Sequence, residues 1–302
     1  MIYLIGLIAG SAMGFGYVLQ QRVASHEAGS PPLSMTLLRR IVHRRQWWIG
    51  LLTMSGGQAL GSIALGRSSL ALVEPLLTVS LLVAFLVAAV LMRRWPTWQE
   101  VFGTVLLAGS LGIFLGVSTP RPSSGTRWTV EATVVGALSV AALAGALVAT
   151  ARRRSLAVES ILLATAAGTL YGMQDVATRG TLLAFSAGGI AAAAGSPWPY
   201  LIAGSGLAGL ILTQSAYRVG RLDYSLPPSA AAEPVVGILL GVGLLRDRLS
   251  TSPIALFVDA ICGAGLVAAV VLIARSPALG AVTGHHRRHH HHHAQPTLIH
   301  RP

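Results

Sequence analysis

Leu72-Val73-Glu74-Pro75 and Ala231-Ala232-Glu233-Pro234 each place a carboxylate beside a proline inside a long apolar segment. A proline lacks a backbone N–H and clashes with the carbonyl four residues back, so each pair is expected to open a helix locally. A charged side chain at the centre of a membrane costs about 3 kcal/mol or more unless it faces a polar cavity, a partner or carries a proton. The two stretches therefore predict acidic sites that face each other across a transport cavity, one from each half of an inverted repeat.

The composition is that of a protein that crosses the membrane many times. Of 302 residues, 53% are hydrophobic and only 11% are charged. Apolar runs of about 20 residues match the length of a helix that spans the hydrocarbon core. The net charge of +12 comes from arginines in short loops between these runs, which disfavours nucleic acid as a partner. The lone Cys262 excludes an internal disulfide framework. We therefore expect an all-α integral membrane protein.

Nine membrane-spanning helices are expected from the apolar runs. They are Ile2–Gln20, Trp47–Leu65, Leu70–Met92, Trp98–Ser118, Thr129–Ala151, Leu156–Val176, Trp198–Tyr217, Leu222–Leu245 and Ser252–Ala274. Leu182–Gly195 would make a tenth span if it also crossed. Pro32–Gln46 mixes apolar residues with four arginines and is typical of an amphipathic helix on the membrane surface. Thr97 and Glu100 are spaced as a capping box, and all six tryptophans lie at segment ends, as in an interfacial belt.

The arginines predict the orientation in the membrane. With nine spans, sixteen of the 22 basic residues, all arginines, fall on one side. The other six are Arg67, Arg121, Arg127, Arg179, Arg246 and Arg248. The richer side is expected to be cytoplasmic, which places the N-terminus outside and the C-terminus inside a bacterial cytoplasmic membrane. Ten spans would give a weaker division of twelve against ten.

An internal repeat becomes visible when the two halves are compared. Gly10 to Gly14 resembles Gly168 to Gly172, and Gln58 followed by Glu74-Pro75 recurs as Gln214 followed by Glu233-Pro234. Corresponding spans run in opposite directions, so the repeat is inverted, an arrangement common in secondary transporters. We expect a first repeat over 1–118, a connecting span in 119–155, a second repeat over 156–275 and a disordered histidine-rich cytoplasmic tail over 276–302.

Several landmarks resemble the drug/metabolite transporter superfamily, including its EamA-like members and the NIPA-type putative magnesium transporters. They are Trp47-Trp48-Ile49-Gly50, Gly57-Gln58, Leu72-Val73-Glu74-Pro75-Leu76, Thr213-Gln214 and Leu222-Asp223. The resemblance implies a fold of nine or so helices and transport of a small molecule or cation. It covers most of Trp47 to Ser118 and, less evenly, Ala167 to Arg275.

The departures from that family concern its polar positions. A family glutamate is Gln58 here, a nearby asparagine is Gly61, and a Lys-Glu pair is Arg93-Arg94. The family's Thr-Pro has become Glu-Pro at both places. Magnesium prefers oxygen ligands and keeps several waters, so the loss of acidic positions weakens the expectation of a magnesium cargo, and magnesium or another divalent cation is kept as an alternative.

Seven polar residues inside spans are candidates for binding a substrate or coupling a proton: Glu233, Glu74, Gln58, Gln174, Gln214, Asp175 and Asp259. Pro75, Pro227, Pro228 and Pro234 are the expected helix-breaking residues, and the span with three of them is expected to be discontinuous. Each acid has a structural alternative. Glu74 fits an interfacial carboxylate at a helix that starts at Pro75, Glu233 fits a protonated acid that holds unwound backbone, and the glutamines fit hydrogen bonds between helices.

The function expected from these features is secondary transport by alternating access, with an unidentified small molecule or cation as substrate. A non-transporting membrane scaffold or sensor with the same fold is the alternative. No catalytic motif is found, so an enzyme is not expected, and no cofactor is expected. Clustered histidines in the tail, His289 to His293 among them, could hold a metal ion, although no defined ligand spacing accompanies them. The expected partners are the lipid bilayer and the substrate, with a homodimer left open.

Overall fold

Helices form all the regular structure in the part of the chain that the computed structural model describes. That part comprises residues 2–26, 35–65, 70–91, 95–118, 129–152, 154–219, 222–245 and 252–275, and it contains no strand. The helices are α1 (Ile2–His26), α2 (Met35–Val42), α3 (Arg45–Leu65), α4 (Leu70–Leu91), α5 (Trp98–Ser118), α6 (Val130–Ala151), α7 (Leu156–Ala194), α8 (Trp198–Val219), α9 (Leu222–Leu245) and α10 (Pro253–Ala274). The histidine-rich tail lies outside the described residues.

The described helices are those of an all-α membrane protein. Five are long and apolar enough to cross a membrane: Tyr3–His26, Val130–Ala151, Leu156–Ala194, Tyr224–Leu245 and Pro253–Ala274. Large apolar side chains remain exposed on these helices, for example Ile190, Ile254 and Phe257. A surface of this kind is stable against lipid chains and costly against water.

Local signals account for several helix ends. Thr97 and Glu100 form the predicted capping box, since the Thr97 N–H donates to Glu100 Oε2 at 2.9 Å and the Glu100 N–H donates to Thr97 Oγ1 at 3.3 Å. The Ser252 hydroxyl accepts from the Ala255 N–H at 3.1 Å ahead of α10. The segment Pro32–Gln46 contains a helix, α2, which ends before Gln46 because α3 already begins at Arg45.

The predicted sixth span, Leu156–Val176, lies within a longer helix, because α7 continues to Ala194. Polar residues beyond Val176 fit the helix, since the hydroxyls of Thr178 and Thr181 donate to the carbonyls of Gln174 and Ala177, each at 2.8 Å. The helix is broken only at Gly188 and Gly189, where Gly189 has a φ of 68°, a conformation that favours glycine.

After the kink, the chain folds back so that the start of α8 contacts α7 at Gly180. Trp198 is fully buried, and a Cβ atom at Gly180 would collide with its indole ring. Leu182–Gly195 lies between these two contacting positions, so it forms a hairpin on the end of α7. The tryptophan belt is likewise only partly as expected, since Trp47 and Trp198 are buried while Trp48, Trp95 and Trp98 are exposed.

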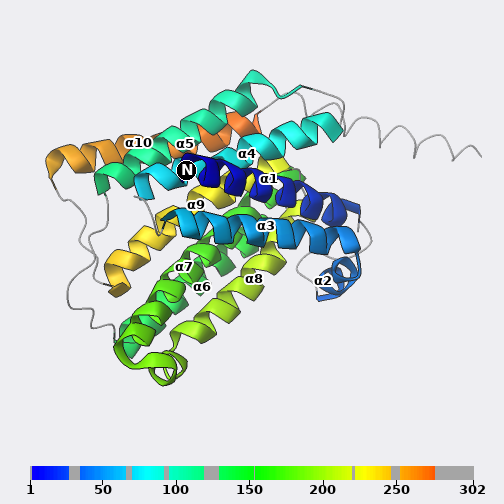
Figure 1. The fold of residues 1–302 in the computed structure, drawn as a ribbon. Coiled ribbons are helices and arrows are strands. Elements are labelled where there is room, and N and C mark those ends of the chain that lie inside the picture. Colours follow the sequence, from blue (N-terminus) through cyan, green and yellow to red (C-terminus); the bar gives the residue numbers. More distant parts are fainter. Residues whose placement is uncertain are drawn as a thin grey trace, which may run out of the picture.

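Two helix groups of similar construction make up the bundle (Figure 1). In the first half α1 packs against α3 and α4, and in the second half α7 packs against α8 and α9. Between the halves, α5 packs against α10 and α1 packs against α8. Glycines allow the closest approaches, because a Cβ at Gly14 of α1 would collide with the Ser80 carbonyl of α4, and one at Gly168 of α7 would collide with the Ser229 carbonyl of α9.

Candidate functional site

Glu233 lies near two tyrosines, and a third tyrosine lies near those two, where four helices meet. Glu233 of α9 is half-buried, and it lies close enough to Tyr17 of α1 and Tyr171 of α7 to interact electrostatically with both. Tyr217 of α8 is within the same reach of Tyr17 and Tyr171. We call these four residues the tyrosine–glutamate cluster. Its members come from both halves of the bundle, which makes it the main candidate site.

Tyr171 is held in place from two sides. Its hydroxyl forms a hydrogen bond of 3.0 Å with the Thr213 hydroxyl of α8. Its ring lies over Gly209, where a Cβ atom would come within 2.7 Å of Tyr171 Cε1. The neighbouring Gly172 lets α7 approach α9 so closely that a Cβ there would be 2.5 Å from the Glu233 carbonyl oxygen. The sequence Tyr171-Gly172 therefore fixes the distance between the aromatic ring and the helix that bears the carboxylate.

Tyr17 and Tyr217 form the other side of the cluster. Tyr217 is 2% exposed in a core that includes Val18 and Leu226, and Tyr17, Ala230 and Val235 pack against that core. The carboxylate of Glu233 therefore lies beside a mostly apolar, aromatic wall. A carboxylate beside such a wall interacts with a cation more strongly than one in bulk water.

The three prolines of α9 do not break the helix, contrary to the expectation of a discontinuous span. Pro227, Pro228 and Pro234 lie within one helix from Leu222 to Leu245. All three lie beyond the first turn of α9, so each removes an intrahelical donor. The carbonyl oxygens of Asp223, Tyr224 and Ala230 therefore lack their intrahelical N–H partners. The Ala230 carbonyl is one turn from Glu233, so Pro234 adds a polar backbone atom there without unwinding the helix.

A pair of buried amides joins the two halves beside the cluster. Gln214 Nε2 of α8 donates to Gln20 Oε1 of α1 at 2.7 Å, and both side chains are 1% exposed. Gln20 Nε2 is also 3.8 Å from the sulfur of Met54 in α3. Gln214 Oε1 is buried with no hydrogen-bond partner among the described residues. This arrangement matches the helix-joining role that the sequence left open for Gln214.

We expect Gln20 and Gln214 to be energetically coupled. Replacing either one with leucine leaves the other amide buried without its partner, whereas replacing both removes the need for a hydrogen bond. A double-mutant cycle on thermal unfolding in detergent should give a coupling energy of about 0.6–1.7 kcal/mol, the range found for hydrogen bonds between membrane helices. If the effects of Gln20→Leu and Gln214→Leu simply add, the bond contributes nothing to holding the halves together.

The other predicted residues lie apart from the cluster or at its margin. Gln58 and Asp175 are on exposed surfaces of α3 and α7, and Asp259 is half-buried on α10 near Cys262. Gln174 lies against α8, where a Cβ at Gly206 would come within 2.9 Å of Gln174 Oε1. Glu74 and Pro75 belong to the backbone of α4, which begins five residues earlier at Leu70, so Pro75 does not start the helix. Their side chains lie outside the described residues.

Comparison with known proteins gives one relative and no family. The chain is 25% identical over 249 residues to an uncharacterized protein of Corynebacterium glutamicum, an alignment that covers 81% of this chain and 84% of the relative. No family model and no solved structure matches the chain. The similarity over most of both chains indicates that the relative shares the helical bundle as a whole.

The tyrosines and Gln20 were not predicted from the sequence. Tyr171 carried the clearest signal, because it lies within an apolar segment and its hydroxyl needs a partner there. It also follows Gly168 by three residues and precedes Gly172, so it belongs to a surface that packs closely. No such signal identifies Tyr17 or Gln20. The described residues contain no group of three or more His, Cys, Asp or Glu side chains able to hold a metal ion.

Proposed function

We propose that this protein is a secondary transporter, not an enzyme, and that it moves a cationic substrate or exchanges it for protons by alternating access. The observation that carries the proposal is Glu233, an ionisable side chain in the middle of an apolar helix and within reach of tyrosines from both halves. Intramembrane acids of this kind usually mark substrate or proton pathways. The proposed setting is the cytoplasmic membrane of a bacterium, with nine spans and the N-terminus outside.

Matched helix contacts support the inverted repeat that this mechanism needs. In the first half, a Cβ at Gly57 of α3 would lie 2.7 Å from Met13 Cγ of α1. In the second half, Thr213 of α8 bonds to Tyr171 of α7. Met13 and Tyr171 hold the same place in the repeated glycine motif, and Gly57 and Thr213 each precede a repeated glutamine. The motif of α1 thus packs on α3 at the position where the motif of α7 packs on α8.

The glycine motif of α1 packs on α4, and the glycine motif of α7 packs on α9. The residues of α4 and α9 that make corresponding contacts are not those that the sequence comparison had matched. A Cβ at Gly14 would meet the Ser80 carbonyl, the Val83 side chain and the Ala84 amide. At Gly172 it would meet the Glu233 carbonyl, the Val236 side chain and the Gly237 amide. These contacts relate Glu233 to Ser80, and Pro228 to Pro75, while Glu74 falls nearly two turns from the place that corresponds to Glu233. The proposed site therefore has one central carboxylate, not a symmetric pair.

Organic cations suit this site better than magnesium. Tyrosine rings attract ammonium and guanidinium groups through cation–π interactions, and Glu233 supplies the opposite charge. Magnesium requires several oxygen ligands in octahedral geometry and holds its water tightly. One carboxylate beside phenol rings meets that need poorly. Magnesium and other divalent cations are therefore the second choice of substrate, after organic cations.

Uptake into proteoliposomes tests the proposal. The purified full-length protein should accumulate at least one member of a panel of amines, amino acids and metal ions under a proton gradient of one polarity. Protein-free liposomes and dissipation of the gradient are the controls. If no member of the panel moves under either polarity, transport is not the function, and the alternative of a membrane scaffold or sensor takes its place.

A further inference from the structure

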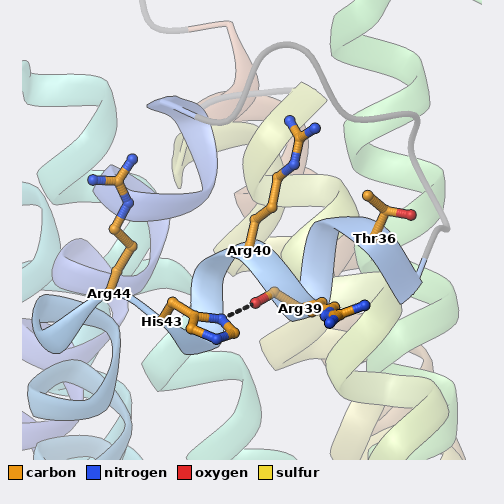
Figure 2. A pocket seen from close by; sticks show the side chains of 5 residues that line it. All are labelled: Thr36, Arg39, Arg40, His43 and Arg44. Atoms are coloured by element: carbon orange, nitrogen blue, oxygen red, sulfur yellow. Dashed lines mark hydrogen bonds between the residues drawn. The ribbon is translucent and has the colours of Figure 1, made fainter.

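The short helix α2 carries a basic pocket at the surface of the bundle (Figure 2). An open hollow of about 570 Å³ is lined by Thr36, Arg39, Arg40, His43 and Arg44. Among the described residues, no acidic side chain lines it. The three guanidinium groups bear fixed positive charge, and all five lining side chains are exposed. We call this hollow the arginine pocket. Its charge and its donors suit an anion with several oxygen atoms.

The opposite side of α2 fixes the pocket on the bundle. Ile41 is fully buried in a small core with Val23 of α1 and Trp47 of α3, and Leu210 of α8 packs against the same core. The helix is also closed at its C-terminal end, where the Trp48 indole N–H donates to the Val42 carbonyl at 2.7 Å. The arginines are therefore held by a docked helix and not by a free loop.

The ring of His43 has a defined orientation in the pocket. His43 Nδ1 is 2.6 Å from the Arg39 carbonyl, and because a carbonyl can only accept, Nδ1 must carry the proton. Nε2 is then the nitrogen left to meet a ligand. The same hydrogen bond fixes the imidazole relative to the backbone of the turn that bears Arg39 and Arg40.

The position of α2 indicates which anion is available to it. The helix immediately precedes α3, and the exposed ring of Trp48 at the start of α3 is typical of the boundary between lipid chains and headgroups. Basic side chains on an amphipathic helix at this level meet the phosphates of anionic lipids. A soluble phosphate would have to compete there with a dense layer of headgroups.

We propose that the arginine pocket is a binding site for the headgroup phosphate of an anionic phospholipid. The guanidinium groups of Arg39, Arg40 and Arg44 supply the positive charge that attracts the phosphate oxygens. Because α2 contacts α1 and α3 of the first half and α8 of the second, the helix that bears the pocket is held by both halves of the bundle. The site does not depend on what the protein transports.

Native mass spectrometry of the detergent-solubilised full chain tests this site. Phosphatidylglycerol should be retained more strongly than phosphatidylcholine with the same acyl chains. Arg39→Gln/Arg40→Gln should weaken phosphatidylglycerol binding about 30-fold, the effect of removing two interfacial charges. Arg39→Lys/Arg40→Lys, which keeps the charge, should lose much less. The matched control is Arg152→Gln/Arg154→Gln, which removes two exposed arginines elsewhere and should bind like the wild type.

Several results would overturn the proposal. Equal weakening in the control variant would mean that lipid responds to overall charge and not to the pocket. Equal retention of the two lipids, or no weakening in Arg39→Gln/Arg40→Gln, would remove the site altogether. Displacement of phosphatidylglycerol by millimolar inorganic phosphate would assign the pocket to a soluble anion. Thermal unfolding without added lipid, unchanged among the variants, would show that each result reports binding and not misfolding.

Discussion

Glu233→Gln is expected to abolish uptake driven by a proton gradient while leaving substrate binding measurable. Glutamine keeps the size and hydrogen-bonding capacity of the side chain but cannot release a proton or bear a negative charge. If Glu233 exchanges a proton for the substrate, this change removes the coupling and not the site. Initial uptake into proteoliposomes and substrate binding to the same preparation are the two measurements. Gradient-driven uptake should fall to the level of protein-free liposomes, because a side chain that cannot exchange a proton cannot couple the gradient to the substrate.

The control for this experiment is Glu131→Gln, because Glu131 is an exposed acid in the first turn of α6. It should transport like the wild type. Tyr171→Phe is a second informative variant, since it removes the hydroxyl bonded to Thr213 but keeps the ring. We expect weaker substrate binding with coupling retained. If Glu233→Gln loses uptake, binding and thermal stability together, Glu233 is a structural acid and the transport assignment loses its principal support.

Gly172→Ala in α7 is expected to lower the stability of the bundle. The added Cβ would lie 2.5 Å from the Glu233 carbonyl oxygen and 2.8 Å from the Gly237 amide nitrogen. Both are backbone atoms of α9, so no side-chain rotation can make room and the helices must move apart. Overpacking of this kind costs about 1–3 kcal/mol. Thermal unfolding in detergent measures the effect directly.

The matched control is Gly145→Ala in α6, where nothing lies within 4 Å of the added Cβ. Since alanine favours a helix by up to about 1 kcal/mol over glycine, this variant should be as stable as the wild type or more stable. Gly263→Ala in α10 is a second open position of the same kind. Destabilisation of Gly145→Ala equal to that of Gly172→Ala would mean that glycine flexibility, and not close packing, determines the result.

The sequence was sufficient for features that depend on neighbours along the chain. Most helix ends were predicted to within a few residues, and the capping box of Thr97 and Glu100 is confirmed because both its partners lie in one turn. The buried and exposed faces of α2 likewise follow from the spacing of its apolar and basic residues along the chain. The continuation of α7 past Val176 was missed because Thr178 and Thr181 are polar residues. In the structure their hydroxyls donate to backbone carbonyls of the same helix.

The candidate site was predictable only in part, because its geometry depends on contacts between distant helices. Glu233 was identified from the cost of burying a charge, which is a property of a single position. Tyr17, Tyr171 and Tyr217 join it only after α1, α7 and α8 have packed. The equivalence of Glu74 and Glu233 was inferred from a shared dipeptide. The glycine contacts instead make Ser80 the counterpart of Glu233, because Ser80 contacts the glycine motif of α1 as Glu233 contacts the glycine motif of α7.

The length of α7 has a practical consequence. Residues 156–187, before the kink, extend about 48 Å at 1.5 Å per residue, while the hydrocarbon layer is about 30 Å thick. The helix is therefore longer than the hydrocarbon layer is thick, and the Gly188–Gly189 bend lies near its end. A Cβ atom added at Gly189 would meet nothing within 4 Å, and an open bend of this kind tolerates inserted residues well. An epitope placed there can report from intact cells which side of the membrane this end of the protein faces.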